Sequence, residues 1–297
     1  MRQSNEAAYV QPRPGSVRCI SPSGLHRLAY TEWGDPANPH VLLCVHGLTR
    51  SGRDFDVLAA RLSSDYRVVC PDVVGRGQSD RLANPAGYGV PQYVADMITL
   101  IARLNVETLD WFGTSMGGLI GLAMAGLDGT PISRLLLNDV GPHVEPDSLT
   151  RIGEYLGVTP PFASEQDGID YLAALAASFG PHSADEWRAL NAPLLIERDD
   201  VWHIRYDPGI ALPFKNVTPE QLAAGEGMLW QNLEKFDGQI LVVRGAESDL
   251  LTRATVDQMK DRGRHISSVE IAGVGHAPSF VHDDQIRIAE AFFLGSH

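Results

Sequence analysis

The chain has 297 residues, of which 44% are hydrophobic and 21% are charged, a balance typical of a globular protein. Its 24 lysines and arginines against 37 aspartates and glutamates give a formal net charge of −13, and no run is rich in Lys or Arg. This charge argues against nucleic acid and against anionic membrane surfaces as partners. The length suits one large α/β domain or two smaller ones.

The three cysteines, Cys19, Cys44 and Cys70, each lie in a short apolar run without CxxC or Cys/His spacing. This pattern predicts buried small residues and favours neither a disulfide framework nor a metal site. The first 15 residues, MRQSNEAAYVQPRPG, lack the apolar core of a signal peptide, and no apolar run reaches 18 residues. We therefore expect a cytoplasmic protein without a membrane span.

Strand-like and helix-like stretches alternate along much of the chain. Strands are expected at residues 16–20, 26–33, 40–46, 66–70, 108–112, 133–138, 239–245 and 267–272. Helices are expected at 52–63, 91–104, 115–127, 253–262 and 282–293. From residue 40 onward the strand runs are mostly continuous, as in strands buried on both faces. The pattern predicts an α/β fold with a mostly parallel sheet, helices on both faces, and room for an antiparallel hairpin of the first two runs at one edge.

About 100 residues separate the strand ending at Asn138 from the one starting at Gln239. Helical stretches are expected there at 147–157, 165–178, 184–196 and 218–235, and residues 183–186 and 218–221 have the pattern of helix caps. We interpret residues 141–236 as a helical lid inserted into one core domain, formed by residues 1–140 and 237–297. No linker-like stretch favours a separate domain.

The segment LDWFGTSMGGLIG, residues 109–121, sets one serine among glycines where a strand gives way to a helix. Residues 113–117 match G-x-S-x-G, in which small residues two places before and after a nucleophile let neighbouring backbone segments approach a strained turn. Since the motif follows an apolar run and opens a helix-like one, Ser115 is predicted to be a nucleophile rather than an ordinary turn residue.

A serine hydroxyl needs a general base, and His276 in EIAGVGHAPSF is the candidate among ten histidines. It follows the last strand, so it is expected at the same edge of the sheet as Ser115. An acid must then orient the histidine. We favour Asp249, whose loop follows the penultimate strand. Asp139, after the strand next to that of Ser115, is an open alternative, otherwise a turn or pocket residue, and Glu247 is a weaker one.

Two backbone N–H groups usually hold the oxyanion formed in acyl transfer. Here they are predicted at Met116, directly after the serine, and at Leu48, in the loop that begins HGL. His46 in the same loop is expected to bridge backbone groups rather than act as a base. The glycine loop CPDVVGRGQSD, residues 70–80, lacks the lysine of a phosphate-binding loop, so it is interpreted as a structural turn.

As a set, HGLTRSG, PDVVGRGQSD, GTSMGG, RGAESDLL and GVGHAP resemble, in order, the α/β-hydrolase superfamily from about residue 25 to the C-terminus. The resemblance implies an eight-stranded sheet with only its second strand antiparallel and a helical lid after the sixth strand. It also implies Ser115, Asp249 and His276 as the triad, with Leu48 and Met116 as oxyanion donors. Relatives with an aspartate nucleophile do not fit, and the HGGG loop of lipase-like relatives is absent.

The resulting hypothesis is a carboxylesterase-like serine hydrolase of small to medium esters that needs no cofactor. A C–C hydrolase of diketo acids or a lactonase is the alternative. A C–C hydrolase would need a cationic pocket group, with Arg50, Arg53 and Arg205 as candidates. A ligand receptor on the same fold is less favoured.

The candidate pocket residues come from the insertion and its flanks. Most aromatics there, such as Tyr155, Phe162 and Trp230, are expected in the core. Trp202 and Tyr206 lie outside a clear helical period and are predicted, with Asp139, to line the substrate pocket.

Overall fold

The computed structural model describes residues 11–295. Within that range eight strands form one sheet in the order β1-β2-β4-β3-β5-β6-β9-β10. The strands are β1 (Arg13–Ser21), β2 (Gly24–Trp33), β3 (Val41–Val45), β4 (Arg67–Pro71), β5 (Leu109–Thr114), β6 (Ile132–Asn138), β9 (Gln239–Gly245) and β10 (Ile266–Ile271). All eight predicted strands are found, with ends shifted by a few residues at most.

Only β2 runs against its neighbours, pairing antiparallel with both β1 and β4, while all other pairs are parallel. The predicted topology is therefore confirmed, including the hairpin at the edge. Because β3, β5, β6, β9 and β10 are parallel, their carboxyl ends meet at one edge of the sheet. The loops that follow these strands contain the residues singled out by the sequence.

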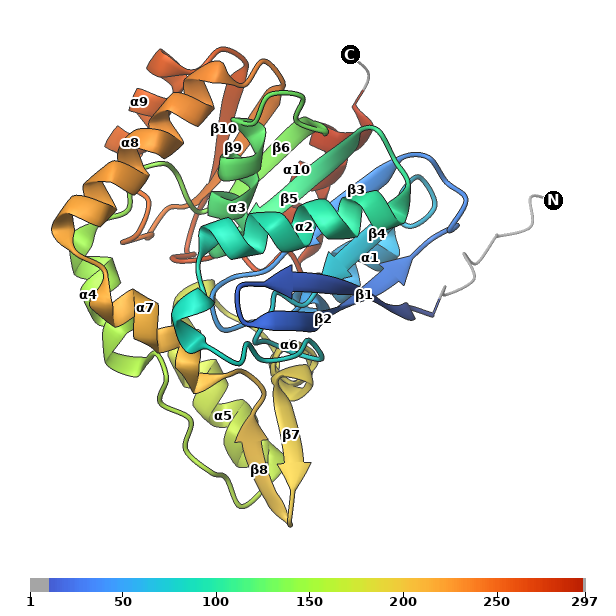
Figure 1. The fold of residues 1–297 in the computed structure, drawn as a ribbon, viewed down its shortest axis with the longest axis vertical. Helices are drawn as coiled ribbons and strands as arrows, with labels where there is room; N and C mark the ends of the chain where they lie inside the picture. The colour runs from blue at the N-terminus through green and yellow to red at the C-terminus, as the bar shows by residue number, and fades with distance from the viewer. Residues whose placement is uncertain (1–10, 296–297) are drawn as a thin grey trace.

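Alternate side chains of the central strands enter two separate apolar cores. In β3, Leu43 and Val45 belong to one core, and Leu42 and Cys44 to the other. The first core is closed by α2 (Val90–Leu104), α3 (Met116–Ala125), α8 (Pro219–Lys235) and α9 (Arg253–Arg262), and the second by α1 (Asp56–Leu62) and α10 (Asp283–Leu294). Figure 1 shows α2 in front of the strands and α10 behind them. Burial on both faces explains the continuous apolar runs in the sequence.

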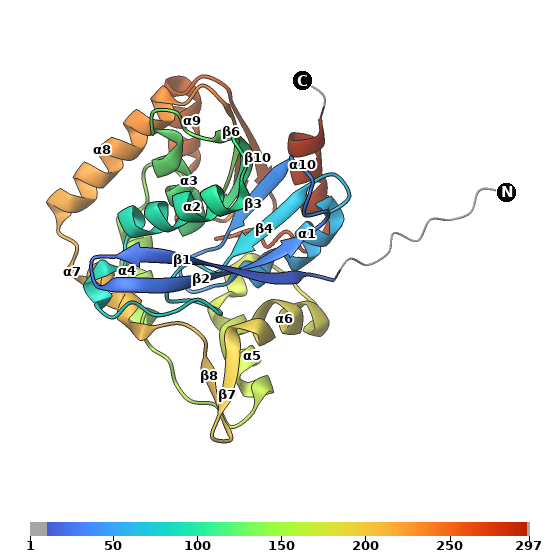
Figure 2. The same cartoon turned by 45° about the vertical axis from the view of Figure 1, so that its right-hand side comes forward.

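The segment between β6 and β9 contains α4 (Pro146–Tyr155), α5 (Glu165–Leu175), α6 (Ala184–Asn191), β7 (Leu195–Arg198), β8 (Val201–Ile204), α7 (Ala211–Asn216) and α8. Figures 1 and 2 show α5, α6 and the β7–β8 hairpin together beyond one end of the sheet. The capping boxes at Ser183 and Thr218 are both formed, as predicted. The insertion is thus largely helical, with a small hairpin at its tip.

The hairpin is the main element that the sequence did not reveal. The helix predicted over 184–196 ends at Asn191, because Pro193 cannot continue it, and β7 starts at Leu195. The chain then turns at Asp199 and Asp200, with φ of 50° and 60°. Two consecutive positive φ angles suit a tight hairpin turn, but Asp-Asp is a weak sequence signal for it.

Helix α8 returns from the insertion to the sheet. Trp230 and Leu233 are buried in the same core as α3, and Lys235 donates a hydrogen bond of 2.8 Å to the carbonyl of Gly126. The second half of α8 therefore packs against α3 and the first core.

The cysteines lie inside these cores: Cys19, Cys44 and Cys70 are buried and free, as expected. Among the helices of residues 11–295, none combines the length and the apolar character needed to cross a bilayer. The N-terminal segment predicted to lack a signal peptide lies mostly in residues 1–10, outside the described part of the chain.

Candidate active site

Ser115 lies on a strained turn between β5 and α3. Its φ of 51° and ψ of −116° are unfavourable for any residue with a side chain. The flanking glycines allow the turn, since a Cβ on Gly117 would lie 1.9 Å from the carbonyl oxygen of Val45, and one on Gly113 would lie 2.4 Å from that of Gly117. The glycines around Ser115 are thus required by close backbone approach, as the sequence predicted.

A continuous line of hydrogen bonds starts at the Ser115 hydroxyl. Its Oγ lies 2.9 Å from Nε2 of His276, and Nδ1 of His276 lies 2.7 Å from Oδ2 of Asp139. Asp139 is fully buried directly after β6, and its carboxylate also accepts from the Gly245 N–H at 2.8 Å and the Ser248 hydroxyl at 2.6 Å. This arrangement orients the ring so that Nε2 can take the serine proton while Nδ1–H faces the carboxylate.

The structure corrects the acid that the sequence favoured. Asp249 and Glu247 are both exposed, and Asp249 pairs with Arg151 through two hydrogen bonds of 3.0 Å. The end of β9 and the loop that follows it instead direct the Gly245 amide and the Ser248 hydroxyl at Asp139. Asp139, the alternative acid and a predicted pocket residue, is the carboxylate in contact with His276.

The two predicted oxyanion donors lie next to the serine. Met116 is the first residue of α3, and the N–H groups at the start of a helix have no partner within it. A Cβ built on Gly47 would lie 3.8 Å from Cβ of Ser115, so the Gly47–Leu48 backbone passes close to the serine. Within residues 11–295, no protein acceptor takes a hydrogen bond from the Leu48 or Met116 N–H. Both residues therefore lie close to Ser115.

His46 bridges backbone groups, as predicted, and does not reach Ser115. Its Nδ1 donates to the Gly47 carbonyl at 2.7 Å, and its Nε2 accepts from the Val73 N–H at 2.9 Å. Burial, aided by the charges of the nearby Arg76 and Arg50 and opposed by the hydrogen bond to the Gly47 carbonyl, lowers the pKa of His46 to about 3. The neutral ring therefore links the loop after β3 to the loop after β4.

This buried neutral histidine predicts a pH dependence of stability. Between about pH 6.5 and pH 3 the unfolded chain binds a proton at His46 that the folded chain does not, so stability falls as the pH drops through that window. We expect the stability of His46→Gln, which can keep one bridge, to fall by about 3 kcal/mol less than that of wild type between pH 6.5 and pH 4, since each pKa unit corresponds to ~1.4 kcal/mol.

Urea unfolding at both pH values measures this difference. His40→Gln is the matched control, because His40 is exposed. Equal slopes for wild type and His46→Gln would contradict the assignment.

Two cavities meet at Ser115 and Leu48. The smaller, of about 110 Å³, adjoins His276, and Arg50, Phe179, Leu194 and Tyr206 are part of its lining. The larger, of about 640 Å³, adjoins Met116 and is lined mainly by apolar side chains of α2, α3, α4 and α7. Tyr206 thus lines a cavity beside the serine, as predicted. Trp202 lines neither of these two cavities, so its predicted place in the pocket is wrong. Its backbone instead pairs with that of Phe162 within the insertion.

A third cavity, of about 850 Å³, lies at the opposite edge of the sheet. Its lining includes Tyr66, Asp110 and Arg134 but none of the residues around Ser115. Because Ser115, His276 and Asp139 all follow carboxyl ends of strands, the two cavities at that edge are the relevant ones despite their smaller size.

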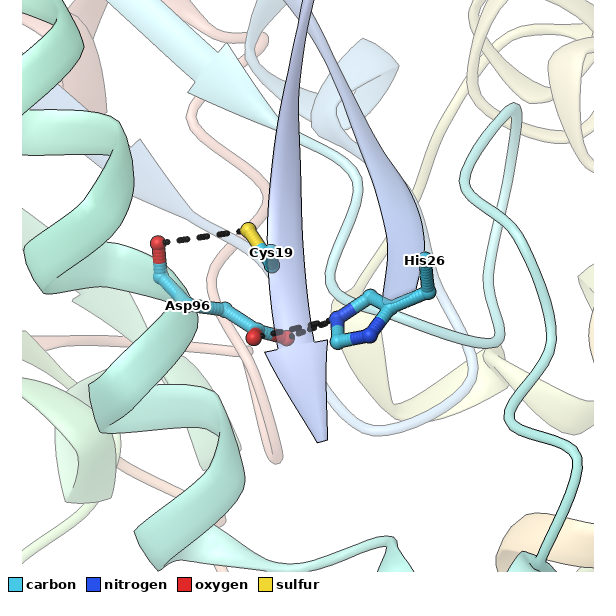
Figure 3. Close-up of side chains that lie close together, drawn as sticks. All are labelled: Cys19, His26 and Asp96. Carbon is cyan, nitrogen blue, oxygen red and sulfur yellow. Dashed lines mark hydrogen bonds and ion pairs between the residues drawn. The ribbon is translucent and has the colours of Figure 1, made fainter. Parts of the chain in front are cut away.

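Within residues 11–295, one cluster has side chains that could ligate a metal ion: Cys19, His26 and Asp96. Figure 3 shows His26 Nε2 facing the carboxylate of Asp96, at 3.0 Å from both oxygens, while Cys19 Sγ contacts the Asp96 backbone carbonyl at 3.9 Å. Burial, with the charge of Asp96, raises the pKa of the Cys19 thiol to about 12, whereas zinc binds the thiolate. These contacts fit a structural link between the β1–β2 hairpin and α2.

The sheet topology and the strained serine turn at its carboxyl edge are those of an α/β hydrolase. Residues 42–291 match the model of the alpha/beta hydrolase family, and the chain belongs to this family. It is therefore a hydrolase, and the resemblance seen in the sequence is confirmed.

Individual relatives agree with this assignment. The 3-hydroxybutyrate-oligomer hydrolase of Cupriavidus necator is 59% identical over 291 residues, which cover 97% of this chain and 99% of that protein. A solved structure from Rickettsia typhi is similar with a TM-score of 0.86 and 30% identity, over 97% of this chain and 100% of that one. An alpha/beta hydrolase from Novosphingobium aromaticivorans gives 0.83 and 30%, over 96% and 99%.

Proposed function

We propose that this protein is a serine hydrolase that cleaves the ester bonds of 3-hydroxybutyrate oligomers. The observation that supports it most is the hydrogen-bonded line Ser115–His276–Asp139 between two cavities, in a chain that is 59% identical to a 3-hydroxybutyrate-oligomer hydrolase. Such an oligomer presents a chain on each side of every ester bond, and two separate cavities reach Ser115.

In this proposal Ser115 Oγ attacks the ester carbonyl while His276 Nε2 takes its proton, and Asp139 stabilises the imidazolium. The Leu48 and Met116 amides bind the oxyanion. When the carbonyl re-forms, the C–O bond breaks and His276 gives its proton to the leaving alcohol. Water then transfers a proton to His276 and attacks the acyl-serine; the acyl C–Oγ bond breaks, His276 returns the proton to Ser115 Oγ, and the acid is released.

The position of His276 orients the substrate. Because His276 protonates the leaving oxygen, the alcohol part belongs in the smaller cavity, which His276 lines. The acyl part then lies in the larger apolar cavity, which Met116 lines. At about 110 Å³ the alcohol cavity is much smaller than the acyl cavity of about 640 Å³, so a short leaving group is favoured.

The C–C hydrolase alternative required an arginine free to bind a substrate carboxylate. Arg50 lines the smaller cavity, but Asp54 holds it through three hydrogen bonds of 2.7 to 3.1 Å. Arg53 pairs with Asp56, and Arg205 donates to Gly77 and Gln78 outside this cavity. These contacts leave the ester hypothesis as the better supported one.

The test is turnover of a 3-hydroxybutyrate trimer, followed by chromatography of the products. We expect monomer and dimer to accumulate. If the trimer is inert while simple esters are cleaved, the substrate assignment is wrong; if both are inert, ester hydrolysis itself is wrong.

The orientation is tested with ethyl octanoate and octyl acetate, two isomers that exchange the long and short sides. We expect kcat/KM to be about tenfold higher for ethyl octanoate, a difference of ~1.4 kcal/mol in the barrier. A preference for octyl acetate would reverse the assignment of the two cavities.

A further inference from the structure

Arg76 is a buried guanidinium group beside the proposed oxyanion site. It lies in the glycine loop after β4, is 1% exposed, and forms no ion pair with any carboxylate of residues 11–295. Charged side chains are almost never fully buried unless they are paired, because desolvation is costly. An unpaired buried cation at this place therefore calls for an explanation beyond folding.

Neutral groups take up the hydrogen bonds of Arg76. Its Nε donates to the Leu48 carbonyl at 2.8 Å, and its Nη1 donates to the Val74 carbonyl at 2.7 Å and to the Tyr93 hydroxyl at 3.0 Å. The rings of Tyr88 and Tyr93 lie 5.7 and 5.1 Å from its Cζ. These partners hold the guanidinium in place without cancelling its charge.

The same side chain contacts both residues that are predicted to bind the oxyanion. Its Nε holds the carbonyl of Leu48, and its Nη2 lies 3.6 Å from Sδ of Met116. Leu48 belongs to the loop after β3 and Met116 to the start of α3, so Arg76 connects two segments whose N–H groups must converge on one oxygen. A small shift of either amide would weaken that binding.

We propose that Arg76 is a positioning residue of the oxyanion site: it fixes the Leu48 loop against α3, and its uncompensated charge favours the negatively charged tetrahedral state over the neutral ester. The inference rests on the proposed ester hydrolysis. A charge in a low-dielectric interior acts over several ångströms, so the guanidinium need not touch the oxyanion. The glycine loop interpreted from the sequence as a structural turn would then serve the site through this arginine.

The experiment compares wild type, Arg76→Met and Arg76→Lys on a p-nitrophenyl ester. For each protein kcat, KM and the inhibition constant of an alkyl trifluoromethyl ketone are measured, since this ketone forms a tetrahedral adduct with the serine. We expect Arg76→Met to lower kcat about 100-fold with little change in KM, as when an oxyanion donor is removed. Inhibitor affinity should weaken in parallel with kcat/KM, and Arg76→Lys should recover part of both.

Arg134→Met is the matched control, because Arg134 is also largely buried and hydrogen-bonded but lies at the opposite edge of the sheet. It should lower the unfolding midpoint and leave kcat and inhibitor affinity unchanged. If Arg76→Met does not fold, Arg76→Lys alone decides, with an expected loss of about tenfold in kcat and in inhibitor affinity.

Folded Arg76 variants with wild-type kcat and inhibitor affinity would overturn the inference. So would a loss confined to KM. Failure of the proposed function is distinguishable from failure of this inference, because the wild-type enzyme itself would then hydrolyse no ester.

Discussion

Asp139→Asn should lower kcat by about 10⁴-fold, whereas Asp249→Asn should leave kcat within about threefold of wild type. Replacing the carboxylate of a Ser-His-Asp triad by an amide has an effect of this size, because the ring is then held in the wrong tautomer. Here the Oδ2 of Asp139 lies 2.7 Å from Nδ1 of His276, while Asp249 is bonded to Arg151 at the surface. Steady-state kinetics on a p-nitrophenyl ester measure both variants.

The buried position of Asp139 requires a control for folding. Its carboxylate also accepts hydrogen bonds from Gly245 and Ser248, so an amide there can lower stability as well as activity. Ser248→Ala removes one of these bonds but keeps the carboxylate and the His276 contact. We expect a lower unfolding midpoint and a kcat within about tenfold of wild type. Full activity of Asp139→Asn, or loss of activity in Asp249→Asn, would restore the acid that the sequence favoured.

The sequence was sufficient to predict the sheet and the positions of Ser115 and His276. Strands buried on both faces have continuous apolar runs, so their number and their positions in the chain could be inferred before any contact was known. Both residues follow such strands directly or within a short loop, and the parallel topology then places them at one edge. Local patterns decide these features.

The acid could not be chosen on the same grounds. Asp139 and Asp249 both precede His276 and both follow strands, so chain order does not distinguish them. The difference arises in the β9 loop: Arg244 donates to the carbonyls of Ala246, Ser248 and Leu251, and the loop it holds leaves Asp249 at the surface. One signal was available, since Asp139 immediately follows the last residue of β6, whereas Asp249 stands four residues beyond β9.

The cavities were the least predictable part. The lining of the smaller one comes from residues 47–55, 114–115, 151–206 and 276–280, which only the folded insertion brings together. Tyr206 and Trp202 are four residues apart, yet Tyr206 lines this cavity and Trp202 pairs with Phe162. The sequence did not predict the β7–β8 hairpin, whose register decides which of these side chains faces the cavity.

Ser115 can be tested for its catalytic role and for backbone strain with one pair of variants. Both Ser115→Ala and Ser115→Gly lack the hydroxyl, so both should lose at least about 10⁵-fold in kcat, in line with the loss of a nucleophilic serine in other hydrolases. They should differ in stability. At φ 51° and ψ −116° an alanine keeps the strain of the serine, whereas glycine adopts such angles readily.

Relief of that strain, of the order of 1 kcal/mol, should outweigh the greater freedom that glycine has in the unfolded chain. Ser115→Gly should therefore unfold at a higher urea concentration than Ser115→Ala. A fluorophosphonate should add its mass to wild type and to neither variant. Residual turnover or labelling in Ser115→Ala would assign the nucleophile to another residue. Equal unfolding midpoints of the two variants, with labelling lost, would leave the nucleophile in place and show that the serine turn stores no measurable strain.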